Sequence, residues 1–239
     1  MTTILDRKKP LGGKAYGSIP HLPGSRMGPA DYHCHEGQRV ICCEKRRDKH
    51  DVVIVTEKLD GSNVSVANIG GKLVPLTRAG YVANTSPYPQ HHIFFEWALH
   101  HERRFLDILS PGERLVGEWL AQAHGTRYAL QGAEPFVPFD LIYPNGRVPT
   151  LQFALACAAI EIIPAKVIHV GEPLDVDTAM ELLGQGHHGA IDPVEGAVWR
   201  VERRGAFDFI AKWVRPDKKD GCLLPDISGT GETVWNWRP

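Results

Sequence analysis

The stretch Lys58-Leu-Asp-Gly-Ser-Asn63 follows directly on the apolar run Asp51-Val-Val-Ile-Val-Thr56. A β-branched run of this kind predicts a strand. Asp-Gly-Ser-Asn then predicts a tight turn into a second alternating run, Val64-Ser-Val-Ala67. We therefore expect a hairpin that carries a lysine at the end of its first strand.

This lysine has two interpretations. It can be an exposed hairpin residue, or it can be a covalent nucleophile. Lysine amines attack electrophiles once burial or neighbouring cations lower their pKa from about 10.4 towards neutrality. Lys-x-Asp-Gly alone is weak evidence for the second interpretation, so the rest of the chain decides between them.

The composition indicates an ordinary globular protein: 239 residues, 43% hydrophobic and 23% charged, with a net charge of −1. A net charge near zero provides no general basic field, so a nucleic acid would have to be bound by a local patch. No apolar run reaches the length of about 20 residues that crosses a bilayer, and the N-terminus lacks the apolar core of a secretory signal. Five cysteines, an odd number, indicate a reducing compartment. We expect a cytoplasmic protein without a membrane partner.

Sequence patterns predict a mixed fold. Residues 1–36 form an irregular arm, rich in Gly and Pro from residue 10 onward. Helices are expected at 91–109, at 151–160 and after Asp177, which resembles an N-cap. Strands are expected at 38–43, 51–57, 62–69, 71–77, 114–120, 135–143, 166–170, 194–202 and 207–213. Runs of strands with inserted helices predict an α+β fold of mainly antiparallel sheets flanked by helices, in a single domain over residues 1–239.

Charged residues recur within or at the ends of these mostly apolar strands. Such a residue is costly to bury unless it is paired, bound to a metal or functional. A single one would be explained by a buried salt bridge, but five in succession after Lys58 indicate a site. They are Arg78, Glu118, Asp140 after Phe139, Glu195 before Gly196, and Lys212.

In this order the segments resemble the covalent nucleotidyltransferase superfamily of polynucleotide ligases and RNA capping enzymes, and most of all its RNA ligases. The resemblance spans residues 57 to 215. It rests on six short motifs that keep the order found in the superfamily. Lys58–Asn63 matches the nucleophile motif, Lys-x-Asp-Gly with a following Asn, and Arg78-Ala-Gly80 matches the Arg–Gly motif. Gly117-Glu118 matches the Gly-Glu motif, and Phe139-Asp140 matches the aromatic-Asp motif. Glu195-Gly196 matches the Glu-Gly motif, and Lys212 matches the final lysine motif.

Two departures from the family pattern stand out. The last motif usually carries a second lysine two residues after the first, but here Val214 holds that position and Arg215 follows it. Either Arg215 bends round to replace the second cation or that contact is missing. Residues 216–239 are also too few for the C-terminal OB barrel of DNA ligases and capping enzymes, whose five strands each need about five residues. The expected absence of that barrel favours an RNA ligase.

The resemblance implies an ATP-dependent RNA ligase of RNA repair. ATP is the AMP donor, Mg²⁺ (or Mn²⁺) the metal, and RNA with 5′-phosphate and 3′-hydroxyl ends the substrate. Lys58 would become lysyl-AMP, Lys212 would contact the α-phosphate, and Asp60 and Glu195 would lie near the metal. Further roles are implied for nucleotide-binding residues: Glu118 with the ribose, Phe139 stacked on adenine, Glu57 and Leu59 along the adenine edge, and Asn63 and Arg78 with phosphate or nucleic-acid termini.

Several questions stay open at this level. A minimal DNA ligase, a guanylyltransferase, or a ligase-like binding module without catalysis are the alternatives, and a partner protein could supply further RNA-binding surface. Paired histidines such as His91-His92 suggest surface or packing positions. Cys34, Cys42 and Cys43 are better explained as buried free thiols than as zinc ligands. Candidates for a basic RNA track are Arg26, Lys45-Arg46-Arg47, Arg103-Arg104, Arg203-Arg204 and Lys218-Lys219.

Overall fold

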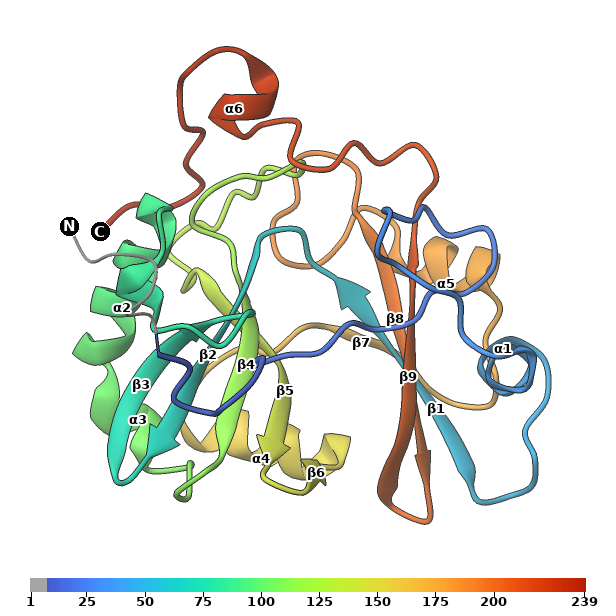
Figure 1. The fold of residues 1–239 in the computed structure, drawn as a ribbon. Helices are drawn as coiled ribbons and strands as arrows, with labels where there is room; N and C mark the ends of the chain where they lie inside the picture. The colour runs from blue at the N-terminus through green and yellow to red at the C-terminus, as the bar shows by residue number, and fades with distance from the viewer. Residues whose placement is uncertain (1–7) are drawn as a thin grey trace.

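The computed structural model describes residues 8–239, in which two antiparallel sheets lie side by side (Figure 1). The α+β class and the antiparallel pairing are therefore confirmed. One sheet has four strands in the order β7 (Val167–Gly171), β1 (Asp51–Lys58), β8 (Gly196–Arg203), β9 (Ala206–Val214). The other has five, in the order β3 (Lys72–Thr77), β2 (Ser62–Ile69), β4 (Arg114–Trp119), β5 (Phe136–Tyr143), β6 (Gly146–Arg147).

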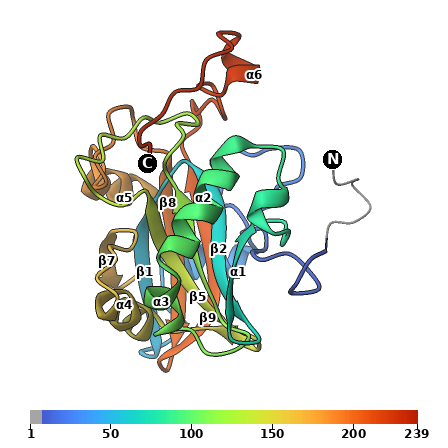
Figure 2. The same ribbon diagram turned by 90° about the vertical axis from the view of Figure 1, so that its left-hand side faces the viewer.

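Helices cover the outer faces of both sheets (Figures 1 and 2). The five-stranded sheet is covered by α2 (Pro89–His100), α3 (Glu102–Leu106) and α4 (Thr150–Ala159), and the four-stranded sheet by α1 (Glu36–Cys43) and α5 (Val176–Leu183). A 3-10 turn, η2 (Ala83–Thr85), precedes α2. Each sheet therefore has its own apolar core, one around Phe94, Trp119 and Phe136 and the other around Val55 and Trp199. The space between the sheets is left for a pocket.

The expected hairpin at the lysine is wrong, because β1 and β2 belong to different sheets. Lys58 is in register with Gly196 of β8, whereas Ser62 is in register with Trp119 of β4. Residues 59–61 carry the chain from one sheet to the other. Gly61 is needed at this crossing, since a Cβ there would lie 2.5 Å from the Trp119 carbonyl oxygen.

Three other local expectations also need correction. Residues 36–43 form helix α1, not a strand, and its first turn is closed by the Gln38 side chain, which accepts a hydrogen bond from the His35 N–H. Helix α5 begins two residues earlier than expected, because Asp175 is the N-cap and accepts from the Thr178 N–H at 2.9 Å. The expected helix at 91–109 is divided into α2 and α3 at His101.

The N-terminal arm runs along the open edge of β9. The Lys212 N–H donates to the Pro20 carbonyl at 2.9 Å, and the Leu22 N–H donates back to the Lys212 carbonyl at 2.8 Å. Further along, the Arg26 N–H donates to the Val214 carbonyl at 2.9 Å. The arm thus satisfies backbone groups that an edge strand would otherwise expose, and it places its own side chains beside the last strand.

After β9 the chain folds back over the loop that follows β4. This C-terminal segment contains the short helix α6 (Pro225–Ser228) (Figure 1), and the Asn236 N–H donates to the Ala121 carbonyl at 2.8 Å. No OB barrel is formed within the described residues. Within residues 8–239, no helix combines the length and apolar character that a membrane crossing requires.

Candidate nucleotide-binding site

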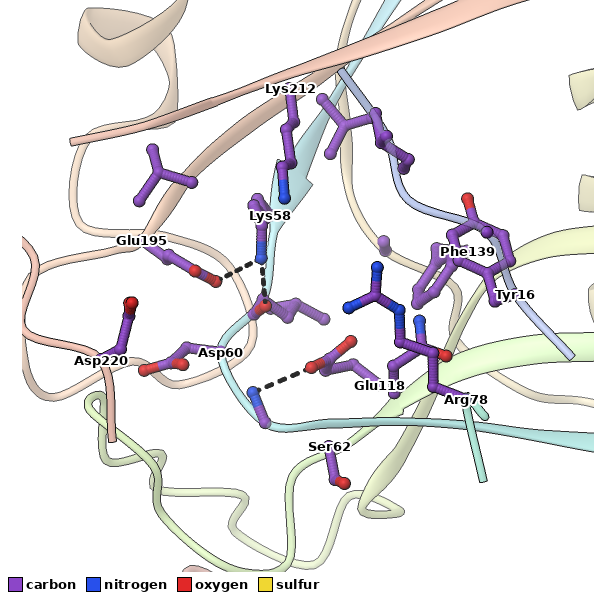
Figure 3. A pocket seen from close by; sticks show the side chains of 18 of the residues that line it. Tyr16, Lys58, Asp60, Ser62, Arg78, Glu118, Phe139, Glu195, Lys212 and Asp220 are labelled. Carbon is purple, nitrogen blue, oxygen red and sulfur yellow. Dashed lines mark hydrogen bonds and ion pairs between the residues drawn. The ribbon is translucent and has the colours of Figure 1, made fainter. Parts of the chain in front are cut away.

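A pocket of about 630 Å³ lies between the two sheets, and residues of the arm and of the C-terminal segment complete its wall (Figure 3). Ten of the residues that the motifs indicated for the site line it, although they come from segments spread over most of the chain. They are Glu57, Lys58, Leu59, Asp60, Asn63, Arg78, Glu118, Phe139, Glu195 and Lys212. Asp140 is the exception, because it is buried in ion pairs with Arg147 and Arg200 and does not line the pocket. The fold therefore gathers these ten residues around one cavity.

Lys58 ends β1 with its ammonium group in the pocket, where the side chain is 22% exposed. Its Nζ lies 2.5 Å from Glu195 Oε2, directly opposite in the pocket (Figure 3). Burial alone would lower the pKa of Lys58, but the carboxylates of Glu195 and Glu118 outweigh it and raise the pKa above its usual range. The expectation of a depressed lysine pKa is thus wrong for the protein without nucleotide, in which Lys58 is a protonated ion-pair partner.

Glu118 lies in β4 on the pocket wall, opposite the crossing between the sheets. Its Oε1 accepts a hydrogen bond from the Gly61 N–H at 3.0 Å. Burial raises the pKa of Glu118 to about 8, with Glu195 and Asp60 adding to the rise and Lys58 opposing it. A buried ion pair with Arg114 is not formed, because that guanidinium donates to the Ala15 carbonyl instead. Glu118 is therefore available to accept a hydrogen bond from a bound ligand when ionised.

Asp60 is held in place by an ion pair that no sequence pattern indicated. Lys218, from the segment after β9, contacts Asp60 Oδ2 and is itself almost fully buried. The Gly125 N–H donates to the same oxygen at 2.8 Å. Burial removes Lys218 from the candidates for a basic RNA track, since its ammonium is satisfied inside the protein.

One wall of the pocket is aromatic and apolar. Phe139 in β5 packs edge-on against Tyr16 of the arm, with ring centroids 5.3 Å apart (Figure 3). Leu59 is buried nearby. Glu57 is also buried, and its Oε2 accepts from the His187 N–H at 3.0 Å. Burial raises the pKa of Glu57 to about 7. A flat ring system such as a nucleobase would find stacking surface at this wall.

Cations line another part of the pocket wall. Lys212 in β9 lies 3.7 Å from Asp31 of the arm, and burial together with the nearby Lys58 lowers the pKa of Lys212. Arg78 follows β3, is exposed, and donates to Ser18 Oγ at 3.3 Å. Asn63 lies in register with Glu118, and its buried Oδ1 has no hydrogen-bond partner among the described residues. This side of the pocket suits a phosphorylated ligand.

The acidic residues suit a hard divalent cation with few protein ligands. Within residues 8–239 no group of three or more His, Cys, Asp or Glu side chains is arranged around one metal position. Mg²⁺ is commonly held by one or two carboxylates together with water and substrate phosphates. Asp60 and Glu195 could act in this way, because the lysine contacts of both carboxylates involve only one oxygen each, Asp60 Oδ2 and Glu195 Oε2, among the described residues.

Sequence patterns missed the contribution of the arm. Tyr16, His21, Arg26 and Asp31 all line the pocket. The Gly- and Pro-rich arm has neither helical nor strand periodicity, so only its final position against β9 shows that these residues belong to the site.

A histidine of α2 also lies in the pocket wall. His91 is buried, and its two ring nitrogens lie 2.7 Å from Ser62 Oγ and 2.6 Å from Ser86 Oγ. Burial and the nearby His124 lower the pKa of His91 to about 4, so the ring is neutral at pH 7. It fixes the orientation of a serine within the Lys58–Asn63 motif.

Solved structures share this fold at low sequence identity. A point mutant of the Naegleria gruberi RNA ligase without ligand matches with a TM-score of 0.56 and 15% identity over 90% of this chain and 59% of its own. Another mutant of the same ligase, with ATP and Mn, matches with a TM-score of 0.51 and 16% identity. This match covers 84% of this chain and 61% of the ligase chain. The match to an archaeal ATP-dependent RNA ligase has a lower TM-score, 0.48, and 19% identity. It covers 69% of this chain and 42% of the archaeal chain. The chain thus spans less than two thirds of each of these structures.

Sequence comparison gives a more direct assignment. A search of curated protein sequences finds no significant match. The family model described as RNA ligase, in contrast, matches residues 51–214, which run from the first residue of β1 to the last residue of β9. The match therefore includes both sheets and every motif around the pocket, and the chain belongs to the RNA ligase family.

Proposed function

We propose that this protein is an ATP-dependent RNA ligase that works through a lysyl-AMP intermediate. One observation carries the proposal: the Lys58 amine lies inside a pocket that also has a second cation, at Lys212, and an aromatic wall, at Phe139. A nucleotide bound between these walls would direct its phosphates towards the amine. Positioning and charge neutralisation are the main demands of phosphoryl chemistry on a protein.

In the first step Lys58 Nζ forms a P–N bond with the α-phosphorus of ATP. The bond from that phosphorus to the bridging oxygen breaks, and pyrophosphate leaves with the electron pair. The Lys58 ammonium must lose one proton before it attacks and a second as the phosphoramidate forms. Glu195 Oε2, 2.5 Å away, is in place to accept the first, and the second passes to water. Because neighbouring carboxylates raise the pKa of Lys58, we expect the rate of this step to increase as the pH rises above neutrality.

Other residues of the pocket would orient the nucleotide. Lys212 would neutralise the α-phosphate, Glu118 would accept a hydrogen bond from a ribose hydroxyl, and Phe139 with Tyr16 would stack on adenine. Asp60 and Glu195 would hold Mg²⁺ or Mn²⁺, which would add positive charge at the phosphates and draw the negative charge of Glu195 away from Lys58.

The remaining steps concern RNA. AMP would pass from Lys58 to a 5′-phosphate end, and a 3′-hydroxyl would then displace AMP and seal the strand. Asn63 and Arg78, which also line the pocket, would bind the ends. We extend the proposal to RNA repair in the cytoplasm, with further RNA-binding surface supplied by a partner protein, because the net charge of −1 offers no general attraction for RNA.

The test is covalent labelling. Purified protein would be incubated with Mg²⁺ and α-labelled ATP or GTP and separated on a denaturing gel beside Lys58→Ala. Label from ATP on the wild type alone supports the proposal, and label from GTP would indicate a guanylyltransferase. The absence of any label, with intact mass showing no AMP already attached, would leave a binding module.

A further inference from the structure

The last strand lacks a cation where the RNA ligase pattern has one. Val214 lies two residues after Lys212, and both side chains line the pocket. Arg215, the adjacent cation, faces elsewhere: its guanidinium pairs with Asp217 at 2.5 Å, and it is not among the described residues that line the pocket. Strand alternation explains this, because neighbours along a strand point to opposite faces. Arg215 therefore does not replace the missing lysine.

The N-terminal arm brings a different arginine to the same level of β9. The Val214 N–H donates to Ser25 Oγ at 2.9 Å, and the Arg26 N–H donates to the Val214 carbonyl at 2.9 Å. These two bonds fix the backbone of Arg26 beside Val214. Arg26 also lines the pocket, and its guanidinium pairs with Asp220. Figure 3 shows Asp220 beside Asp60 and Glu195.

We propose that Arg26 supplies the second phosphate-binding cation, in place of the lysine that position 214 lacks, and contacts the triphosphate of ATP during lysine adenylylation. This inference rests on the function proposed above. A guanidinium has five donors in a planar fork that fits two phosphate oxygens at once. The contact matters for charge balance, because Lys58 loses its charge when it forms the phosphoramidate. Lys212 would then be the one lysine of the described pocket lining that still carries a charge as pyrophosphate departs.

The present partner of Arg26 can be displaced. Its guanidinium pairs with Asp220, and the two side chains are 31% and 61% exposed. An ion pair this open to water contributes little free energy. A triphosphate, with more negative charge and several acceptor oxygens, competes well for the same donors. The guanidinium can therefore exchange Asp220 for a triphosphate, while the backbone hydrogen bonds to β9 keep the arm in place.

The experiment measures lysyl-AMP formation against ATP concentration, without RNA. A hydrogen bond to a charged group contributes about 1.5–3 kcal/mol, so Arg26→Ala should lower the rate at subsaturating ATP by about 10- to 100-fold, and Arg26→Lys should lose less. The decisive variant combines Arg26→Ala with Val214→Lys, which restores the family pattern and should recover much of the rate.

Two controls separate this role from a structural one. Arg39→Ala removes an arginine of α1 that is 24% exposed and also paired with carboxylates, far from the pocket lining, and should label like the wild type. Asp220→Asn breaks the Arg26 ion pair but keeps the cation, and should lower the KM for ATP. Thermal unfolding of each variant would verify that it is folded.

Each outcome decides the proposal. A rate for Arg26→Ala equal to that of Arg39→Ala overturns it, and so does an equal loss in Asp220→Asn, which would show that the ion pair alone matters. If Val214→Lys leaves the rate of Arg26→Ala unchanged, the two positions do not serve the same phosphate. An unlabelled wild type would overturn the proposed function itself, whereas a labelled wild type with the results just named overturns only the role of Arg26.

Discussion

Two lysine–carboxylate pairs begin two residues apart in the chain, yet they differ in what surrounds the lysine. Lys58 contacts Glu195 and keeps 22% of its side chain exposed to the pocket. Lys218 contacts Asp60 with 1% of its side chain exposed, and Thr126 Oγ1 lies 3.5 Å from its ammonium. The two carboxylate side chains are equally buried, each with 10% exposed. The two pairs therefore differ in the exposure of their lysines. An amine that is to react needs an open side, whereas an amine that fixes a turn does not.

The largest effect should come from removing the exposed amine. Lys58→Met keeps the aliphatic stem and removes the charge, and we expect it to abolish covalent AMP formation completely, because no other amine lies at that position. Its stability should change less than that of the Lys218 variant below, because the Lys58 side chain is 22% exposed and water already screens its ion pair, whereas Lys218 is 1% exposed. Intact-mass measurement after incubation with ATP and Mg²⁺ checks the first expectation. Any remaining adduct of AMP mass on the variant would contradict the assignment of Lys58.

The buried pair should give the largest loss of stability. Removing one member of a buried ion pair typically costs about 3–5 kcal/mol, because the other charge is left without a partner. We therefore expect Lys218→Met to lower the free energy of unfolding by an amount in this range. Urea titration monitored by tryptophan fluorescence would measure it, with Lys219→Met as the exposed control. A loss no larger than that of Lys58→Met would remove the distinction between the two pairs.

The crossing between the two lysine pairs can be tested at a glycine. Gly61→Ala would place a Cβ 2.5 Å from the Trp119 carbonyl oxygen, which is backbone and cannot easily move. We expect a loss of roughly 1–3 kcal/mol from this overpacking, together with slower labelling of Lys58. Gly37→Ala is the matched control, because it lies in helix α1 with nothing within 4 Å of the added Cβ and should be neutral or slightly stabilising.

The pH dependence of stability offers a test at Glu118. The pKa of Glu118 is about 8 in the folded protein and ordinarily 4.5. Between these values the native state holds a proton that the unfolded chain has lost, so this contribution is complete below about pH 4.5 and is lost as the pH rises through 8. Glu118→Gln should therefore flatten the decline in unfolding free energy between pH 5 and 8, whereas Glu232→Gln, at an exposed site, should not. Parallel slopes for wild type and Glu118→Gln would show that Glu118 carries no such shift.

Local patterns predicted most elements because they depend on local physics. The β-branched run at β1 and the alternation in β2 and β8 were placed within two residues of their observed bounds. The errors in element type and bounds were also local: Val40-Ile-Cys-Cys43 is too short for its apolar pattern to separate a strand from a buried helix. The failed hairpin was not local, because it depended on which sheet each strand joins. Asp175 was missed as a cap because Asp177 offers a similar signal two residues later.

The candidate site was predictable only as a set of residue types in order. Motif order brought together Lys58, Glu118, Glu195 and Lys212, and the pocket contains them all. The partners of these residues were not predictable: nothing in the sequence pairs Asp60 with Lys218, 158 positions away, or places the arm along β9. Such pairings depend on which strands share a sheet, and a strand pattern specifies which face is buried but not its neighbour.

Short stretches of the chain were enough to specify most strands of both sheets, the chemistry of the motif residues and the RNA ligase resemblance, because each of these depends on residues that are close together in sequence. Three features emerged from the folded molecule alone: β1 and β2 part into different sheets, Lys58 meets a carboxylate that raises its pKa, and Arg26 comes to lie beside Val214. The physical reason is that pairing between distant segments is selected by burial and hydrogen bonding across the whole fold.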